Sequence, residues 1–189
     1  MDDNGVAPVL RATNAGAPRA AQHGDLEWML ALNRRHETEL SPLDETSLQR
    51  LVAHAAFVRV ADPGAAFLIA LDQDAAYDSP NFLWFRARYP RFLYVDRIVV
   101  DGHFRGSGLA GRLYGSLFDH ARHIGHGLVT CEVNREPPNP VSDRFHDRFG
   151  FVVAGSARLE NSAKAVTYLA RTLPCDPATG SRDEAGEFG

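Results

Sequence analysis

The feature that most constrains the fold is a strand-like run that leads through a glycine-rich turn into a long helical pattern. Residues 92–100 read FLYVDRIVV, and residues 105–110 read RGSGLA. Apolar residues then recur at helical spacing until Gly125, and a second strand-like run, GLVTCEV, follows at 127–133. This order predicts a strand-helix-strand crossover, in which the helix covers one face of a sheet.

Antiparallel elements are expected on both sides of this crossover. Before it, two short apolar runs are joined by Asp62, Pro63 and Gly64, which are typical of a hairpin turn. After it, two further runs predict a closing antiparallel pair. The strands predicted outside the crossover are 18–21, 57–61, 66–71, 151–159 and 165–172.

Three more helices complete the predicted elements. One is expected from about Asp25, and a short one over 141–149 ends before Gly150. Another should begin at Ser41, which can cap it, with Pro42 in its first turn. Residues 72–90 show no regular period. The order of elements predicts an α+β or three-layer α/β/α fold around a mixed sheet.

The length of 189 residues suits one domain, which we expect to span residues 17–173. Residues 1–16 and 174–189 are rich in small, polar and turn-forming residues. Such segments cannot bury enough apolar surface to become ordered, so we expect a flexible N-terminal extension and a flexible C-terminal tail.

Composition argues against several classes of function. A net charge of −4 gives no support to nucleic-acid binding, which needs a basic surface. No uncharged apolar run approaches the roughly 20 residues that cross a bilayer, and the acidic start does not resemble a secretory signal. Two cysteines, Cys131 and Cys175, suggest neither a disulfide framework nor a zinc site. We expect a cytoplasmic protein with no metal and no nucleic-acid or membrane partner.

The turn RGSGLA has the composition of an anion site. The first backbone amides of a helix have no partner within it, and the helix dipole favours negative charge there. Gly106 and Gly108 let the backbone approach a ligand, Ser107 offers a hydroxyl group, and Arg105 offers positive charge. A tight turn that only caps the helix would explain the same residues.

Two other phosphate-binding motifs place different demands on the sequence. Gly106, Gly108 and Gly111 have the spacing of a dinucleotide-binding turn, but that turn should follow the first strand of its domain. Here a hairpin and two helices precede it. A P-loop needs a lysine after its second glycine, and none is present, so the P-loop is excluded.

Two motifs resemble the GNAT superfamily of N-acetyltransferases, which use acetyl coenzyme A (acetyl-CoA). The family's phosphate-binding motif is Arg or Gln, two residues, Gly, one residue, then Gly or Ala, and Arg105, Gly108 and Ala110 match it. Its C-terminal pattern N-P-x-x-x-x-L-Y-E-K-L-G-F is similar to NPVSDRFHDRFGF at 139–151 in length and at both ends. The resemblance covers about residues 17–172. It implies a three-layer α/β/α fold with a mixed, mostly antiparallel sheet and a splayed central strand pair.

The resemblance also implies how acetyl-CoA binds. In the family, backbone groups of the fourth strand pair with the pantetheine arm and hold the thioester carbonyl, and these positions are Ile98, Val99 and Val100 here. Asn139 resembles an asparagine that contacts the cofactor arm, although capping of the short helix explains it equally well. The pyrophosphate would lie against the backbone amides of Arg105, Gly106, Ser107, Gly108, Leu109 and Ala110.

Acetyl transfer to an amine needs a group that takes a proton from the amine, and it benefits from one that protonates the departing thiolate. The family's usual donor is the tyrosine of LYEKLGF, and His146 stands at that position in this sequence. Histidine can donate a proton near neutral pH. Alternatively, His146 faces solvent on its helix, or the thiolate leaves to solvent unaided.

Asp96 is the first candidate for the base. Polyamine-acetylating members of the family similarly carry a carboxylate four positions before the residue matched by Val100. An ion pair with a nearby arginine would also explain a carboxylate inside an apolar strand. Glu132 on the next strand is the reserve candidate, acting directly or through a water, unless it faces outward.

The sequence leaves the acceptor open among a small amine, an amino acid and a peptide N-terminus. Acidic and aromatic residues between the hairpin and the central strand suit a pocket for a cationic amine. A coenzyme A binding sensor without catalysis is the alternative function, and a preference for longer or acidic acyl groups is a third. Pairing of edge strands would make a homodimer. The acidic and aromatic residues are Asp72, Asp74, Asp78, Tyr77, Phe82, Trp84 and Phe85.

Overall fold

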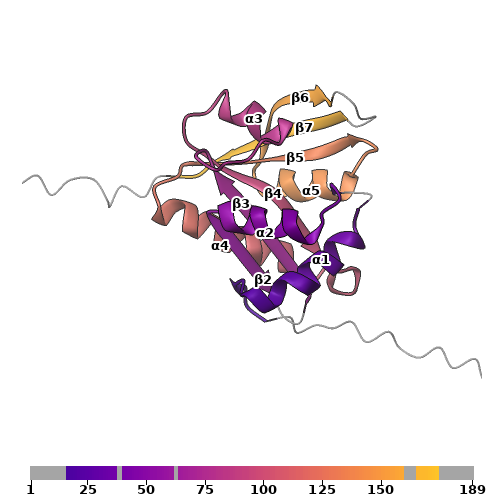
Figure 1. Ribbon diagram of the computed structural model, residues 1–189. Helices are drawn as coiled ribbons and strands as arrows, with labels where there is room; N and C mark the ends of the chain where they lie inside the picture. The colour runs from indigo at the N-terminus through magenta and orange to yellow at the C-terminus, as the bar shows by residue number, and fades with distance from the viewer. Residues whose placement is uncertain (1–15, 38–39, 62–63, 160–164, 175–189) are drawn as a thin grey trace, which may run out of the picture.

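The computed structural model describes residues 16–37, 40–61, 64–159 and 165–174. These residues form one seven-stranded sheet with the strand order β1-β2-β3-β4-β5-β7-β6 (Figure 1). Only β4 and β5 are parallel, and every other neighbouring pair is antiparallel. The strands are β1 (Arg19–Ala20), β2 (Phe57–Ala61), β3 (Ala66–Asp72), β4 (Leu93–Val100), β5 (Leu128–Glu136), β6 (Val152–Arg158) and β7 (Ala165–Thr172).

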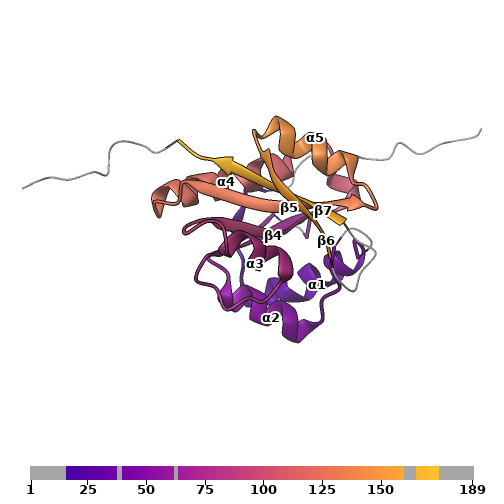
Figure 2. The same cartoon turned by 90° about the horizontal axis from the view of Figure 1, so that it is seen from above.

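Helices cover both faces of the sheet, which confirms the predicted three-layer fold. Helices α1, α2 and α3 lie on one face, and α4 and α5 lie on the other (Figure 2). The helix bounds are α1 (Leu26–Arg34), α2 (Glu45–His54), α3 (Pro80–Arg86), α4 (Leu109–His123) and α5 (Pro140–Arg148), with short 3₁₀ turns at His23–Asp25 and Gly102–Phe104.

Two local predictions differ from the structure. Helix α2 begins at Glu45 and not at Ser41, because Asp44 adopts the extended cap conformation and its carboxylate accepts from the backbone N–H of Ser47. The segment 72–90 contains helix α3, whose buried residues are Phe82 and Phe85. A helix of seven residues is too short to show a clear apolar period in the sequence.

The predicted N-terminal extension and C-terminal tail lie outside the described residues, except for Gly16 and Pro174. Within the described part of the chain, no helix is long and apolar enough to span a membrane.

Strand β4 carries an extra residue at Asp96. In the pairing with β3, Val95 lies opposite Ala70 and Arg97 lies opposite Ile69, so Asp96 has no opposite residue. Such a bulge changes which face the following side chains occupy, because side chains alternate along a strand. Tyr94 faces the layer of α1, α2 and α3 before the bulge. After it, Val99 faces that layer.

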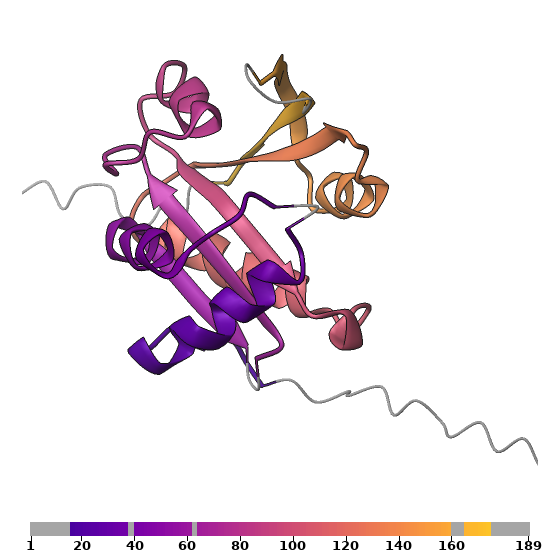
Figure 3. The same cartoon turned by 45° about the vertical axis from the view of Figure 1, so that its right-hand side comes forward.

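The same point of β4 marks the end of its pairing with β5. The parallel ladder joins Leu93–Val95 to Val129–Cys131 and extends no further. Beyond it the two strands diverge, as Figure 3 shows for β4 in pink and β5 in orange. The splayed central strand pair expected from the family resemblance is therefore present.

Strand β6 packs tightly against α3 through Gly155. A Cβ atom there would lie 2.6 Å from Cζ2 of Trp84, whose ring stacks on Tyr168 with 4.1 Å between centroids. We predict that Gly155→Ala lowers the free energy of unfolding by about 1–3 kcal/mol, because the stacked indole has little room to move. Urea denaturation would measure this loss.

Gly115 in α4 is the matched control, since no heavy atom lies within 4 Å of a Cβ built there. Gly115→Ala should raise the unfolding free energy by about 0.5–1 kcal/mol through helix propensity. Equal stability of Gly155→Ala and the wild type would contradict the prediction.

Candidate active site

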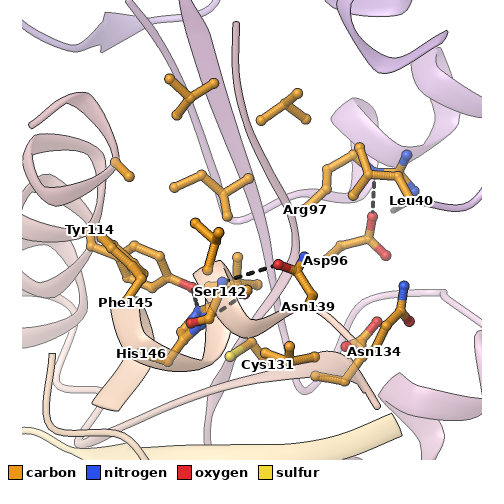
Figure 4. Close-up of a pocket in the computed structure, with 18 of the residues that line it drawn as sticks. Leu40, Asp96, Arg97, Tyr114, Cys131, Asn134, Asn139, Ser142, Phe145 and His146 are labelled. Carbon is orange, nitrogen blue, oxygen red and sulfur yellow. Dashed lines mark hydrogen bonds and ion pairs between the residues drawn. The ribbon is translucent and has the colours of Figure 1, made fainter. Parts of the chain in front are cut away.

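A cavity of about 810 Å³ opens where β4 and β5 diverge (Figure 4). Ser107 is the predicted site residue that does not line it, because its hydroxyl donates to the Phe104 carbonyl oxygen at 2.6 Å. The structure brings the other predicted residues together. They are Asp96, Ile98, Val99, Val100, Arg105, Gly106, Gly108, Leu109, Ala110, Glu132, Asn139 and His146.

The glycine turn enters the cavity at the N-terminus of α4. Gly106 and Gly108 have φ angles of 77° and 79°, a region that L side chains rarely adopt. Gly108 is the cap residue of α4, and it has no side chain to occupy the first helical amides. Those amides have no partner within the helix, and the dipole favours an anion. The turn therefore fits a phosphate or pyrophosphate group.

The cavity side of β4 offers a strand edge. Residues 96–100 lie beyond the β5 ladder, and Ile98, Val99 and Val100 line the cavity. An extended ligand can add to such an edge as if it were another strand. Together with the glycine turn, this edge fits a long molecule that carries a pyrophosphate at one end, which is the shape of coenzyme A.

Asn139 caps helix α5. Its side-chain oxygen accepts from the backbone N–H of Ser142 at 3.1 Å, and Pro140 follows at the first helical position. The capping explanation of this residue is confirmed. Asn139 also lines the cavity, so contact with a ligand stays compatible with its position.

His146 points from α5 into the interface with α4 and is 4% exposed. Its Nε2 lies 2.8 Å from the hydroxyl oxygen of Tyr114, and its Nδ1 lies 2.9 Å from the carbonyl oxygen of Ser142. Nδ1 therefore carries a proton that it donates to this carbonyl, and Nε2 accepts from Tyr114. Burial lowers the pKa of His146. The alternative of a solvent-facing histidine is wrong.

Asp96 is tied to an arginine and a tyrosine. Its Oδ2 lies 2.7 Å from Nε of Arg97, and both side chains are 4% exposed. Its Oδ1 accepts from the Tyr77 hydroxyl at 2.6 Å. The ion pair that the sequence left as an alternative is present, and it commits this carboxylate to two protein partners.

Glu132 faces the same cavity from β5. Tyr94 donates to its Oε2 at 2.8 Å, and Asn81 of α3 donates to its Oε1 at 2.9 Å. Burial and the negative charge of Asp96 raise the pKa of Glu132 to about 7, although the two hydrogen bonds oppose this rise. A carboxylate with a pKa near neutrality can accept a proton and release it again.

The residues that line this cavity were only partly predictable from the sequence. Tyr94 lies within the strand pattern, but Asn81 carries no signal in a segment that looked irregular. Tyr77 lines the cavity as expected. The other acidic and aromatic residues proposed for the acceptor do not line it: Asp72, Asp74, Asp78, Phe82, Trp84 and Phe85.

The comparisons with known proteins agree with this geometry. Residues 26–151 match the model of the acetyltransferase (GNAT) family. No curated protein is similar enough to the sequence to count as a relative.

Several solved structures share the fold at low sequence identity. Ard1 from Thermoplasma volcanium has a TM-score of 0.68 and 16% identity, covering 85% of this chain and 99% of its own. An N-acetyltransferase from Staphylococcus aureus Mu50 has a TM-score of 0.62 and 18% identity, covering 85% and 99%. A putative acetyltransferase from Salmonella typhimurium, solved with its cofactor acetyl-CoA, has a TM-score of 0.63 and 16% identity, covering 89% and 99%.

The Tyr114–His146 hydrogen bond generates a prediction about stability. His146→Phe would remove the hydrogen bond that Nε2 accepts from the hydroxyl of Tyr114, a residue with 0% exposure, and should lower the free energy of unfolding by about 1–3 kcal/mol. Adding Tyr114→Phe removes the hydroxyl that lost this hydrogen bond and should recover most of the loss in unfolding free energy. A double-mutant cycle by urea denaturation measures the coupling. Additive losses in the two single variants would show that the pair does not interact.

Proposed function

The chain belongs to the GNAT acetyltransferase family, whose model matches residues 26–151, and we propose that it transfers an acetyl group from acetyl-CoA to a primary amine. The observation that carries this proposal is the meeting of three features in one cavity: the glycine turn, the open edge of β4 and the carboxylate of Glu132. Bound acetyl-CoA supplies a reactive acetyl thioester. The acceptor is a small amine, an amino acid or a peptide N-terminus.

The chain holds acetyl-CoA mainly through its backbone. The amides of residues 105–110 face the pyrophosphate, where the positive φ angles of Gly106 and Gly108 let the turn approach closely. Residues 98–100 offer backbone groups to the pantetheine arm. An amide on this edge also orients the thioester carbonyl, and a fixed donor of this kind stabilises negative charge that develops on the oxygen.

We assign the role of base to Glu132 in preference to Asp96. An acceptor ammonium must lose a proton before its nitrogen can attack directly, and that proton moves to the Glu132 carboxylate. Asp96 already accepts from Tyr77 and pairs with Arg97, so taking the proton would disrupt both contacts. Glu132 keeps its hydrogen bonds to Tyr94 and Asn81 while its protonation state changes.

The departing thiolate leaves without a proton from His146. Both ring nitrogens of this histidine are engaged by Tyr114 and Ser142, and its lowered pKa leaves the ring uncharged at neutral pH. The tyrosine of the family motif is therefore replaced by a residue that joins α5 to α4. The cavity itself gives the thiolate access to solvent.

Binding and turnover are tested separately. Calorimetric titration with acetyl-CoA should show binding, and a panel of primary amines should include some that release free thiol. Binding without thiol release from any amine would favour a coenzyme A sensor. Failure to bind acetyl-CoA would contradict the role assigned to the glycine turn.

The raised pKa of Glu132 predicts a pH dependence. The base must be ionised to accept a proton, so kcat/KM should rise with pH through about 7 and level off above it. Tyr94→Phe removes a hydrogen bond that holds this pKa down and should move the rise to higher pH. Steady-state rates measured from pH 5.5 to 9 would provide the profile.

The isosteric Glu132→Gln variant should lower kcat/KM by about 10²–10⁴-fold, because an amide cannot take the proton. Asp119→Asn is the matched control. Asp119 is 76% exposed on α4, so this substitution removes the same charge at a position away from the cavity. A Glu132→Gln enzyme with the rate of the control would eliminate Glu132 as the base.

A further inference from the structure

We propose that the acceptor carries a carboxylate as well as its amine, and that the guanidinium of Arg97 binds this carboxylate. The proposal rests on the function proposed above and specifies its substrate class: amino acids and related amino-carboxylates, rather than simple alkyl amines. It comes from the hydrogen-bond inventory of one buried cation, which lines the cavity without having all its donors occupied.

Arg97 is almost completely enclosed, yet one end of its guanidinium remains available. Nε donates to Asp96 at 2.7 Å, and Nη1 donates to the side-chain oxygen of Asn33 at 2.7 Å and to the carbonyl oxygen of Ser41 at 3.5 Å. Nη2 has no hydrogen-bond partner among the described residues. A guanidinium has five N–H donors, so the two on Nη2 are left for a ligand.

The unused nitrogen is not fully enclosed by protein. Within the described part of the chain, His126 Nδ1 is the one enclosed side-chain nitrogen or oxygen that lacks a partner. Nη2 of Arg97 also lacks a partner but is not enclosed in this way, so part of its surface is accessible. Arg97 lines the cavity in which Glu132 lies, and it is only 4% exposed overall. A ligand inside the cavity is therefore the natural partner for Nη2.

The bulge explains why this cation faces the acceptor side. The extra residue at Asp96 places Arg97 on the face of β4 that carries Tyr94 and Val99, toward Asn33 of α1. Without the bulge, Arg97 would alternate onto the face of α4. Arg97 and Glu132 thus lie on the same side of the divergent strands.

The charges of the cavity match a molecule with two opposite charges. An acceptor ammonium is attracted to Glu132 and Asp96, and a carboxylate accepts charge-assisted hydrogen bonds from Nη2. No hydrogen bond joins Asp96 to Nη2, since its Oδ2 accepts from Nε and its Oδ1 accepts from the Tyr77 hydroxyl. An amine without a carboxylate would displace cavity water and leave these donors unpaired, which is costly in a dry site.

Equilibrium binding measurements test the proposed carboxylate site without relying on turnover. The full chain, saturated with coenzyme A, is titrated calorimetrically with the standard α-amino acids and a series of ω-amino acids, each compared with its carboxamide. We expect at least one acid to bind about 10-fold tighter than its amide, because a hydrogen bond to a charged group exceeds one to a neutral group by roughly that factor. Equal affinity for acids and amides throughout the panel would overturn the proposal, as would the absence of binding by any acid.

Variants of Arg97 test whether this residue causes the preference for acids over amides. Arg97→Gln should reduce the acid-to-amide affinity ratio to about 1, and Arg97→Lys should retain part of it. Because Arg97→Gln leaves Asp96 buried without its counterion, the double variant Asp96→Asn, Arg97→Gln provides a second, neutral form of the site. Arg35→Gln is the control, since Arg35 pairs with Asp101 at an exposed position outside the cavity lining. A ratio that survives both Gln variants would assign the preference to another residue.

Thiol release from the same panel separates the two proposals. An acid preference that depends on Arg97 but gives no thiol release would support this inference and contradict acetyl transfer. Thiol release at equal rates from acids and amides would support acetyl transfer and contradict the carboxylate site.

Discussion

The extra residue at Asp96 in β4 is the local constraint on which the candidate site depends. It interrupts the alternation of the strand at the point where pairing with β5 ends. Beyond this point β4 still pairs with β3, but its backbone groups on the β5 side have no partner in the sheet, and buried N–H and C=O groups need partners. The cavity allows water or an extended ligand to satisfy them, so the same interruption creates both the opening and the edge that a cofactor arm can use.

The carboxylates of Asp96 on β4 and Glu132 on β5 lie in different environments. Asp96 is neutralised by Arg97 and hydrogen-bonded by Tyr77, whereas Glu132 has two neutral hydrogen-bond donors and forms no ion pair with the residues that the structure describes. The charge on Asp96 then contributes to the raised pKa of Glu132. One carboxylate is fixed in an ion pair and the other can titrate, which is the arrangement expected where like charges share a low-dielectric site.

The fold was predictable from the sequence because its strongest signals are local. The glycine turn, the helix after it and the flanking strands all follow from short patterns between residues 92 and 133. The site was only partly predictable. The polar pair Asp96 and Arg97 visibly interrupts an apolar run, but a bulge depends on the register with β3, which no local pattern contains.

The surroundings of a side chain were harder still to predict where several helices and strands contribute to them. The pKa of Glu132 depends on Asn81, which comes from a short helix that the sequence did not reveal. His146 was correctly placed on α5, but its orientation depends on Tyr114 of α4, which supplies the hydroxyl partner. Pairs of this kind lie far apart in the chain, so residue type and spacing do not identify them.

The alternation of side chains along β5 decides which residues face each side of the sheet at the site. Cys131 and Val133 pack into the layer of α4, whereas Glu132 between them faces Asn81 and the opposite layer. A shift of one residue in the register of β5 would bury Glu132 against Leu113 and Leu117 of α4 and would present Cys131 to the acceptor side. Burying a carboxylate among leucines is costly, so the register that stabilises the sheet is also the one that places Glu132 in the cavity. Stability and the proposed chemistry therefore favour the same register.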